Sequence, residues 1–255
     1  MISPSGKIGT IGSLRNYSTD GLILNVDFSN DYGFAGNTAN DLRTDIEYST
    51  PGGYVAVVSG STAAPGYIDL DGITDYLPGT TGTSDFLNLQ SFTIDAWIYP
   101  STTSGIRTII SNNTNVASTA NRGFSVILAA TTLDPRLGST ATSLLYTQLV
   151  TGVTCAANEW NNLFIRYSIT GATGTYTAKV FKGGGLSASD YTGSQSSGLP
   201  LGLTSSNAIA LGRRAMSAVQ YFQGRIGTIR MYNKALTTDE IEFNYARNRT
   251  RYGHT

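Results

Sequence analysis

The stretch FQGRIGTIRMYNKALTTDEI, residues 222–241, decides how this sequence is interpreted. Its first half is a strand-like run in which isoleucine, methionine and tyrosine stand among small and charged residues. Its second half begins a helix, because Thr237 and Glu240 have the spacing at which each side chain bonds a free backbone amide of the other. Such a cap contributes about 1 kcal/mol. The stretch predicts a last β-strand followed by one short helix, with Ile241 and Tyr245 on the same side.

Strand-like runs recur through the rest of the chain. They are rich in β-branched and aromatic residues and are separated by glycine, asparagine, serine and proline. In FTIDAWIYP (92–100), apolar residues at alternate positions share one face, and Thr93, Asp95, Trp97 and Tyr99 share the other. Further runs of this kind lie at residues 21–29, 54–60, 67–72, 106–111, 123–129, 144–150, 162–169, 175–182, 208–213 and 224–232. The pattern predicts an all-β sandwich or barrel.

The composition restricts the class of protein. Charged residues make up 13% of the 255 residues, against roughly 25% in an average protein. The 17 basic and 17 acidic residues cancel, so we expect no nucleic-acid partner. No apolar run approaches the roughly 20 residues that span a bilayer, and the start has no apolar signal segment. These features predict a soluble protein, made in a cytoplasm, that does not insert into membranes.

The first 20 residues differ from the rest. They carry Gly6, Gly9 and Gly12 among small and polar residues and show no stable period. We interpret residues 1–20 as an extended arm that docks on a neighbouring subunit, ahead of a single domain over residues 21–255. The side chains expected to make the docking contacts are Lys7, Leu14, Arg15 and Tyr17.

Five blocks, in this order, resemble the concanavalin A-like lectin/glucanase jelly roll of the laminin-G and pentraxin type. They are YIDLDGITDYL (67–77), SFTIDAWIYPS (91–101), EWNNLFIRYS (159–168), IALGRR (209–214) and the closing stretch quoted first. The resemblance covers residues 21–247. It implies a concanavalin A-like jelly-roll sandwich of two antiparallel sheets, with the short C-terminal helix packed over one end. Two positions depart from the family pattern: Asn162 stands where histidine is frequent, and Gly227-Thr228 replace an acidic pair.

The sequence offers little for catalysis. Hydrolases of this fold carry a Glu-x-Asp-x-x-Glu or similar cluster, because an acid and a nucleophile must flank the glycosidic bond. Here Asp95 stands alone on its strand, and the single histidine is His254, next to the last residue. The single cysteine, Cys155, excludes an intramolecular disulfide and suits a buried apolar position better than a nucleophile. We therefore predict that the chain is not an enzyme.

A calcium site is one interpretation of DLDGITD (69–75), since Asp69, Asp71 and Asp75 offer carboxylate oxygens. The spacing does not match an EF-hand loop. The favoured interpretation is a tight turn at Asp71-Gly72, so we expect no cofactor, with calcium as the alternative.

Sugar binding is a third possibility. Trp97 and Tyr99, with Tyr167 and Tyr232 from other strands, would stack on sugar rings if their sheet face is open. Aromatic residues at alternate strand positions more often belong to a core, and the sequence leaves both interpretations standing.

A jelly roll with this ending and a short N-terminal arm is similar to virion proteins of tailed bacteriophages. The resemblance implies a non-catalytic structural protein located in the virion, on the capsid exterior or in a tail appendage. Its partners would be other virion proteins, and it would be oligomeric in the assembly. The alternative is a glycan-binding adhesin module that recognises surface glycans.

Overall fold

The computed structural model describes residues 20–28, 34–35, 38–40, 47–49, 56–58, 66–78, 91–112, 123–138, 147–148, 152–170, 175–186, 191–194, 209–215 and 218–255. All structural statements below concern these residues.

The largest sheet is antiparallel and contains nine of the eighteen described strands. Its main strand order is β15-β14-β13-β8-β18-β6-β5, while β1 pairs with β18 and β16 pairs with β14. The strand bounds are β1 Leu22–Asp27, β5 Ala56–Val58, β6 Tyr67–Asp71, β8 Phe92–Pro100, β13 Asn161–Thr170, β14 Thr175–Lys182, β15 Gly185–Leu186, β16 Tyr191–Ser194 and β18 Gln223–Tyr232.

A smaller sheet faces the large one, with strand order β12-β11-β10-β9-β17-β7. Its strands are β7 Leu77–Pro78, β9 Ile106–Ser111, β10 Gly123–Ala129, β11 Thr132–Gly138, β12 Thr147–Gln148 and β17 Ala210–Leu211. A separate three-stranded sheet consists of β2 Phe34–Ala35, β3 Thr38–Asn40 and β4 Glu47–Ser49.

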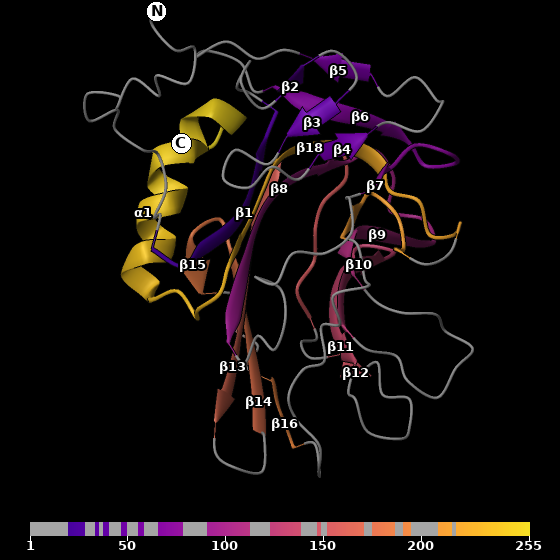
Figure 1. Ribbon diagram of the computed structural model, residues 1–255. Coiled ribbons are helices and arrows are strands. Elements are labelled where there is room, and N and C mark those ends of the chain that lie inside the picture. Colours follow the sequence, from indigo (N-terminus) through magenta and orange to yellow (C-terminus); the bar gives the residue numbers. More distant parts are fainter. Residues whose placement is uncertain are drawn as a thin grey trace, which may run out of the picture.

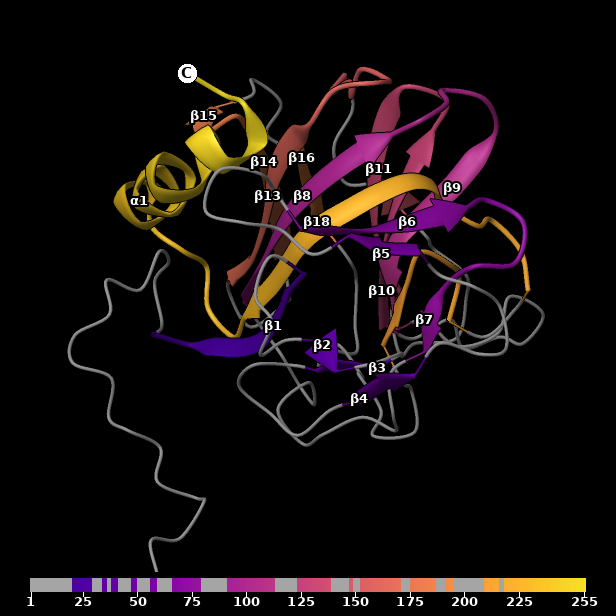
Figure 2. The ribbon, with the colours of Figure 1, turned by 90° about the horizontal axis from the view of Figure 1, so that it is seen from above.

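The main hydrophobic core lies between the two larger sheets. Alternate residues of β8, Phe92, Ile94, Ala96 and Ile98, point into it and are buried. Side chains of β10 such as Phe124 enter from the smaller sheet. Figure 1 shows the two layers, and Figure 2, seen from above, shows them face to face. The predicted all-β sandwich of two antiparallel sheets is confirmed.

The predicted helix is also present. Helix α1 spans Thr238–Asn248, and a 3-10 turn over Arg249–Tyr252 follows it. The capping box forms as expected, since Thr237 Oγ1 accepts from the amide of Glu240 at 3.2 Å, and Glu240 Oε2 accepts from the amide of Thr237 at 2.9 Å. Among the described residues, no helix is both long and apolar enough to cross a bilayer.

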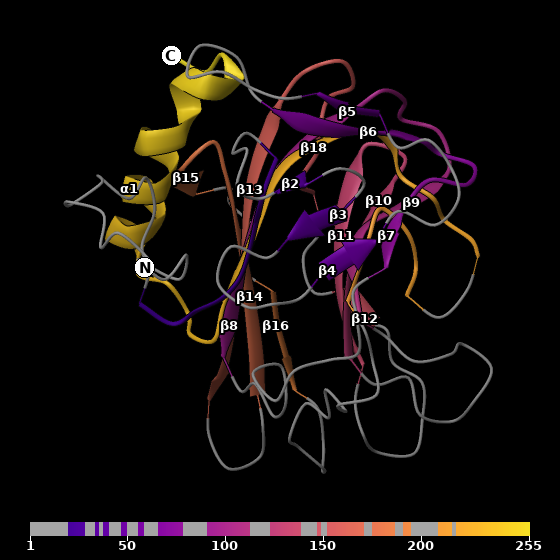
Figure 3. The same ribbon diagram turned by 45° about the horizontal axis from the view of Figure 1, so that its top comes forward.

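The position of the helix differs from the prediction. It does not cover one end of the sandwich but lies on the outer face of the large sheet, as Figures 2 and 3 show. Six residues form a second apolar cluster between helix and sheet: Leu22, Phe164, Phe181, Tyr232, Leu236 and Ile241. The reason is that four strands present apolar or aromatic side chains on this face too, and the helix removes them from water.

Candidate functional site

Three of the four aromatic residues predicted to stack on sugars are inside the protein. Tyr167 lies in the core between the sheets, where its ring stacks on Phe92 at 4.2 Å. Tyr232 is buried under α1, and its hydroxyl accepts from Asn244 Nδ2 at 3.0 Å. Trp97 is also fully buried. For these three residues the sugar-stacking prediction is wrong, because a buried ring presents no face to a ligand.

Trp97 is covered by the C-terminal residues. Its ring stacks on Tyr252 at 4.2 Å, and His254 contacts it edge-on at 5.0 Å. Tyr252 can come this close because residue 227 is glycine: a Cβ there would lie 2.5 Å from the Tyr252 ring. The hydroxyl of Tyr252 also forms a 2.6 Å hydrogen bond with Thr228 Oγ1. The Gly227-Thr228 departure from the family pattern therefore provides the place where the chain end docks.

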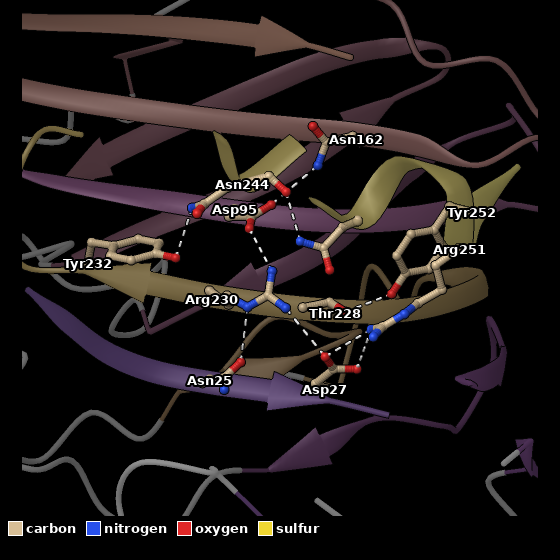
Figure 4. Close-up of polar contacts among 11 residues, drawn as sticks. Asn25, Asp27, Asp95, Asn162, Thr228, Arg230, Tyr232, Asn244, Arg251 and Tyr252 are labelled. Carbon is tan, nitrogen blue, oxygen red and sulfur yellow. Dashed lines mark hydrogen bonds and ion pairs between the residues drawn. The ribbon is translucent and has the colours of Figure 1, made fainter. Parts of the chain in front are cut away.

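A buried ionic network holds the same face together (Figure 4). The Arg230 side chain is fully buried and donates to Asp95 Oδ2 at 3.0 Å, to Asp27 Oδ2 at 3.3 Å and to Asn25 Oδ1 at 3.2 Å. Asn162, the other departure from the family pattern, donates to Asp95 Oδ1 at 3.3 Å. Burial opposes the charge on Arg230, but attraction from Asp95 and Asp27 outweighs it and raises the pKa of this arginine.

The network extends to the chain end through Arg251, which contacts the Asp27 carboxylate at 3.1 Å. Two guanidinium groups, Arg230 and Arg251, thus balance two carboxylates, Asp27 and Asp95. Such a neutral, hydrogen-bonded set fixes how the C-terminal segment sits on the sheet. Arg230 and Asp95 are fully buried and give no ligand access, whereas Arg251 at the edge of the network is partly exposed.

Only Tyr99 of the four predicted aromatics reaches solvent, and it belongs to a patch that the sequence interpretation missed. We call the residues Tyr67, Asp69, Tyr99, Trp160 and Arg225 the aromatic patch. All five are partly exposed. They come from β6, β8, β18 and the turn before β13, on the outer face of the large sheet. The patch borders the C-terminal segment, whose Tyr252 ring lies 4.7 Å from the Trp160 ring.

The rings of the patch contact one another directly. Trp160 lies 5.7 Å from Tyr99 and 6.1 Å from Tyr67, measured between ring centroids. The Arg225 guanidinium lies over the Tyr67 ring at 4.6 Å and over the Tyr99 ring at 5.0 Å. Its Nε contacts Asp69 Oδ2 at 3.4 Å. The patch therefore combines aromatic surface with one hydrogen-bond donor group and one acceptor group, as small-molecule sites do.

The turn that carries Trp160 is well supported. The Asn161 side chain accepts from the amide of Ala156 at 3.2 Å and donates to the carbonyl of Glu159 at 2.9 Å. His254 Nε2 hydrogen-bonds the Trp160 carbonyl at 2.7 Å. These bonds fix the backbone at Trp160, and the rings of Tyr67, Tyr99 and Tyr252 contact the indole. A side chain held in this way loses less entropy on binding.

The three aspartates considered for calcium have other roles. The carboxylate of Asp75 accepts from the amide of Asp71 at 3.1 Å. Asp71 Oδ1 accepts from the amides of Ile73, Thr74 and Asp75 at 2.8, 2.8 and 2.9 Å. Burial opposes ionisation of Asp71, but these bonds outweigh it and lower its pKa to about 2. Asp69 contacts Arg225 instead. In the described part of the chain, no cluster of three or more histidine, cysteine or acidic residues could hold a metal ion. The geometry is that of the favoured tight turn.

Replacing Asp71 by asparagine is expected to change how the stability of the fold depends on pH below 4 (about the ordinary pKa of the group). The folded pKa of about 2 lies below the ordinary 3.8. The stabilisation from the ionised group is therefore complete above the ordinary value and is lost as the pH falls through the folded value. The asparagine side chain keeps an acceptor but no charge, so the unfolding midpoint should vary less between pH 4 and 2 (about the span of the two pKa values). Urea unfolding at several pH values measures this midpoint. The prediction is contradicted if the midpoint of the variant changes with pH as much as that of the wild type.

Cys155 is buried, as expected from sequence, and burial raises its pKa to about 12. A thiol in this state is a poor nucleophile at neutral pH. The proposed docking residues Lys7, Leu14, Arg15 and Tyr17 lie outside the described residues, so the interpretation of the arm stays a prediction.

Solved structures similar to this one include a mutant of Trypanosoma rangeli sialidase displaying trans-sialidase activity (TM-score 0.61, 14% identity, covering 92% of this chain and 34% of that one). The botulinum neurotoxin serotype G binding domain is similar with a TM-score of 0.57 and 14% identity, over 88% of this chain and 50% of that one. The binding domain of Paraclostridial Mosquitocidal Protein 1 has a TM-score of 0.57 and 19% identity, over 88% and 52%.

This chain spans between a third and about half of those proteins, and at such identities the likeness shows the fold alone. No curated protein matches the sequence. A family model described as the concanavalin A-like lectin/glucanases superfamily matches residues 71–242, more than half of the chain. The chain therefore belongs to the concanavalin A-like lectin/glucanases superfamily.

Proposed function

We propose that this chain is a non-catalytic carbohydrate-binding module and that it binds glycans at the aromatic patch. The observation that carries the proposal is the contact of Trp160 with Tyr99 and Tyr67 beside the Asp69–Arg225 pair, on a partly exposed surface. A sugar presents an apolar C–H face and a rim of hydroxyl groups. Aromatic rings next to charged donors and acceptors complement both.

The family and the neighbouring folds support a binding role. The superfamily is that of concanavalin A-like lectins and glucanases, and two of the similar structures are binding domains of toxins. Glycosidases use a pair of carboxyl groups, so a second group besides Asp69 would have to donate or accept a proton. Two further carboxylates lie near the patch, Glu159 and Asp71. Of these, Asp71 accepts four hydrogen bonds within its turn and has a pKa lowered to about 2. Such a group is a poor general acid at neutral pH, which favours binding over hydrolysis.

Binding is tested with Trp160→Ala on an array of neutral and acidic glycans. We expect the wild-type protein to retain at least one class of glycan, and the variant to bind it at least about tenfold more weakly, a loss of about 1.4 kcal/mol. Phe243→Ala is the matched control. Phe243 is an exposed aromatic residue on α1 beside Arg247, outside the patch, and its removal should leave binding unchanged.

Two results would reject the proposal. One is the absence of any retained glycan on the array. The other is unchanged binding by a folded Trp160→Ala protein, with folding judged by circular dichroism.

The structural role in a bacteriophage particle stays a separate prediction. It rests on the resemblance stated above and on the arm, whose residues 1–19 lie outside the described residues. Quantitative mass spectrometry of purified particles tests it. A fixed ratio to the shell protein would support a virion location and virion partners, and absence from the particles would reject them.

A further inference from the structure

We propose that the Asp69–Arg225 pair makes the aromatic patch selective for neutral sugars that present two adjacent hydroxyl groups. This inference rests on the proposed function and names the class of ligand for the same site. The two residues are opposite each other in the pairing of β6 with β18. Their side chains are 41% and 36% exposed, so a ligand can reach both.

The pair leaves hydrogen-bonding capacity free. Asp69 and Arg225 touch only through Oδ2 and Nε, at 3.4 Å. Across the described residues, no other hydrogen bond engages the second Asp69 oxygen or the terminal Arg225 nitrogens. An acceptor and a donor group therefore stand side by side. Two adjacent hydroxyl groups of a sugar match this arrangement, because one can donate to Asp69 while its neighbour accepts from Arg225.

The arginine is fixed in place by the rings beneath it. Arg225 lies over both Tyr67 and Tyr99, at 4.6 and 5.0 Å. A planar guanidinium held on aromatic rings loses little rotamer freedom when it binds a ligand. Arg225 occupies one face of each tyrosine ring. The partly exposed part of Trp160 that its contacts with Tyr67, Tyr99 and Tyr252 leave uncovered is then the surface for the apolar side of the sugar.

The charges around the patch favour a neutral ligand. Asp69 and Arg225 balance each other, and Arg107 lies beside the Asp71 turn, with its Nη1 3.0 Å from where a Cβ on Gly72 would be. Glu159, next to Trp160, is exposed and adds a negative charge. The carboxylate of an acidic sugar would have to displace Asp69 from Arg225 and would then lie near two carboxylates, Asp69 and Glu159. A neutral sugar meets no such repulsion.

The test compares glycans that differ in one group. Oligosaccharides ending in glucose, galactose or mannose are paired with the same oligosaccharides ending in the corresponding uronic acid, and affinities are measured by array and by NMR titration. We expect the wild-type protein to bind the neutral members at least about tenfold more tightly. Asp69→Asn should reduce this ratio, because the repulsion of the uronate disappears while the neutral sugar loses its charged acceptor. Arg225→Gln should weaken binding of both members, and Phe243→Ala should change neither.

The outcomes separate this inference from the proposed function. Equal or tighter binding of the uronic acid members overturns the selectivity, and so does a ratio that Asp69→Asn leaves unchanged. If the uronic acid members bind equally or more tightly and Trp160→Ala abolishes that binding, the patch remains a glycan site of another specificity. If no member of any pair binds, the proposed function itself fails.

Discussion

Arg230→Met is expected to lower the free energy of unfolding by about 3–5 kcal/mol, the range found when one partner of a buried ion pair is removed. The Arg230 side chain is fully buried and contacts Asp95, itself fully buried, and Asp27, which is nearly so. Methionine fills much of the volume but leaves two carboxylates without this partner. Denaturation in urea measures the loss, and a constant slope with denaturant shows that the unfolding transition is otherwise unaltered.

The same strand supplies the control. Arg225 lies on the same face of β18 and also contacts an aspartate, but this pair is more than one third exposed. Arg225→Gln should therefore change the unfolding free energy by less than about 1 kcal/mol. Equal losses of unfolding free energy in the two variants would show that burial does not make the Arg230 ion pairs more important for stability than the exposed Arg225 pair.

The second large effect is expected at Trp97. Trp97→Ala should lower the unfolding free energy by about 3–5 kcal/mol, because the cavity lies in a site that cannot collapse easily. The Trp97 ring stacks on Tyr252 at 4.2 Å, and Asn162 and Thr228 flank it on neighbouring strands. Thermal and urea unfolding measure the effect. A folded Trp97→Ala protein should lose less glycan binding than Trp160→Ala, because Trp97 meets the aromatic patch only through Tyr252, which contacts both tryptophans.

For Trp160→Ala we expect the opposite: a small loss of stability and a large loss of glycan binding. Trp160 is partly exposed and stands before β13, so its removal should destabilise the protein less than removal of Trp97 while abolishing most glycan binding. If instead Trp97→Ala proves as stable as the wild type, the C-terminal segment does not cover the sheet as described.

Much of the fold was predictable because its signals are local. The capping residues Thr237 and Glu240 are three positions apart and meet within one turn of helix. The turn at Asp71 is closed by bonds from its side chain to three of the next four residues, Ile73, Thr74 and Asp75. Strand β8 was recognised from alternation that depends only on backbone geometry. Each of these features is decided by residues within a few positions of one another.

The covering of the outer face was not predictable in the same way. Alternation in β8 predicts one buried and one open face, but Asp95 and Trp97 on the second face are as buried as the core residues. What buries them is a segment about 150 residues further along the chain, α1 and Tyr252. The period of a strand records which residues share a face and does not record what packs on that face.

The binding patch shows the same limit. Tyr67, Trp160 and Arg225 stand far apart in the sequence, and each lies at or near the start of a strand in a block quoted at the outset. Their proximity follows from the pairing of β18 with β6 and with β8, and of β13 with β8. A tryptophan or arginine near a strand start was the available signal, but it does not say which strands are neighbours.

The sequence by itself determined the class of fold, the closing strand and capped helix, and the aspartate turn, because each depends on short-range backbone and side-chain geometry. Only the tertiary structure decided which aromatic residues are accessible. Trp97 and Tyr99 are two residues apart on the same face of β8, yet Trp97 is fully buried and Tyr99 is partly exposed. The physical reason is that the C-terminal segment stacks Tyr252 on Trp97, whereas Tyr99 lies beyond this cover beside Trp160 and Arg225.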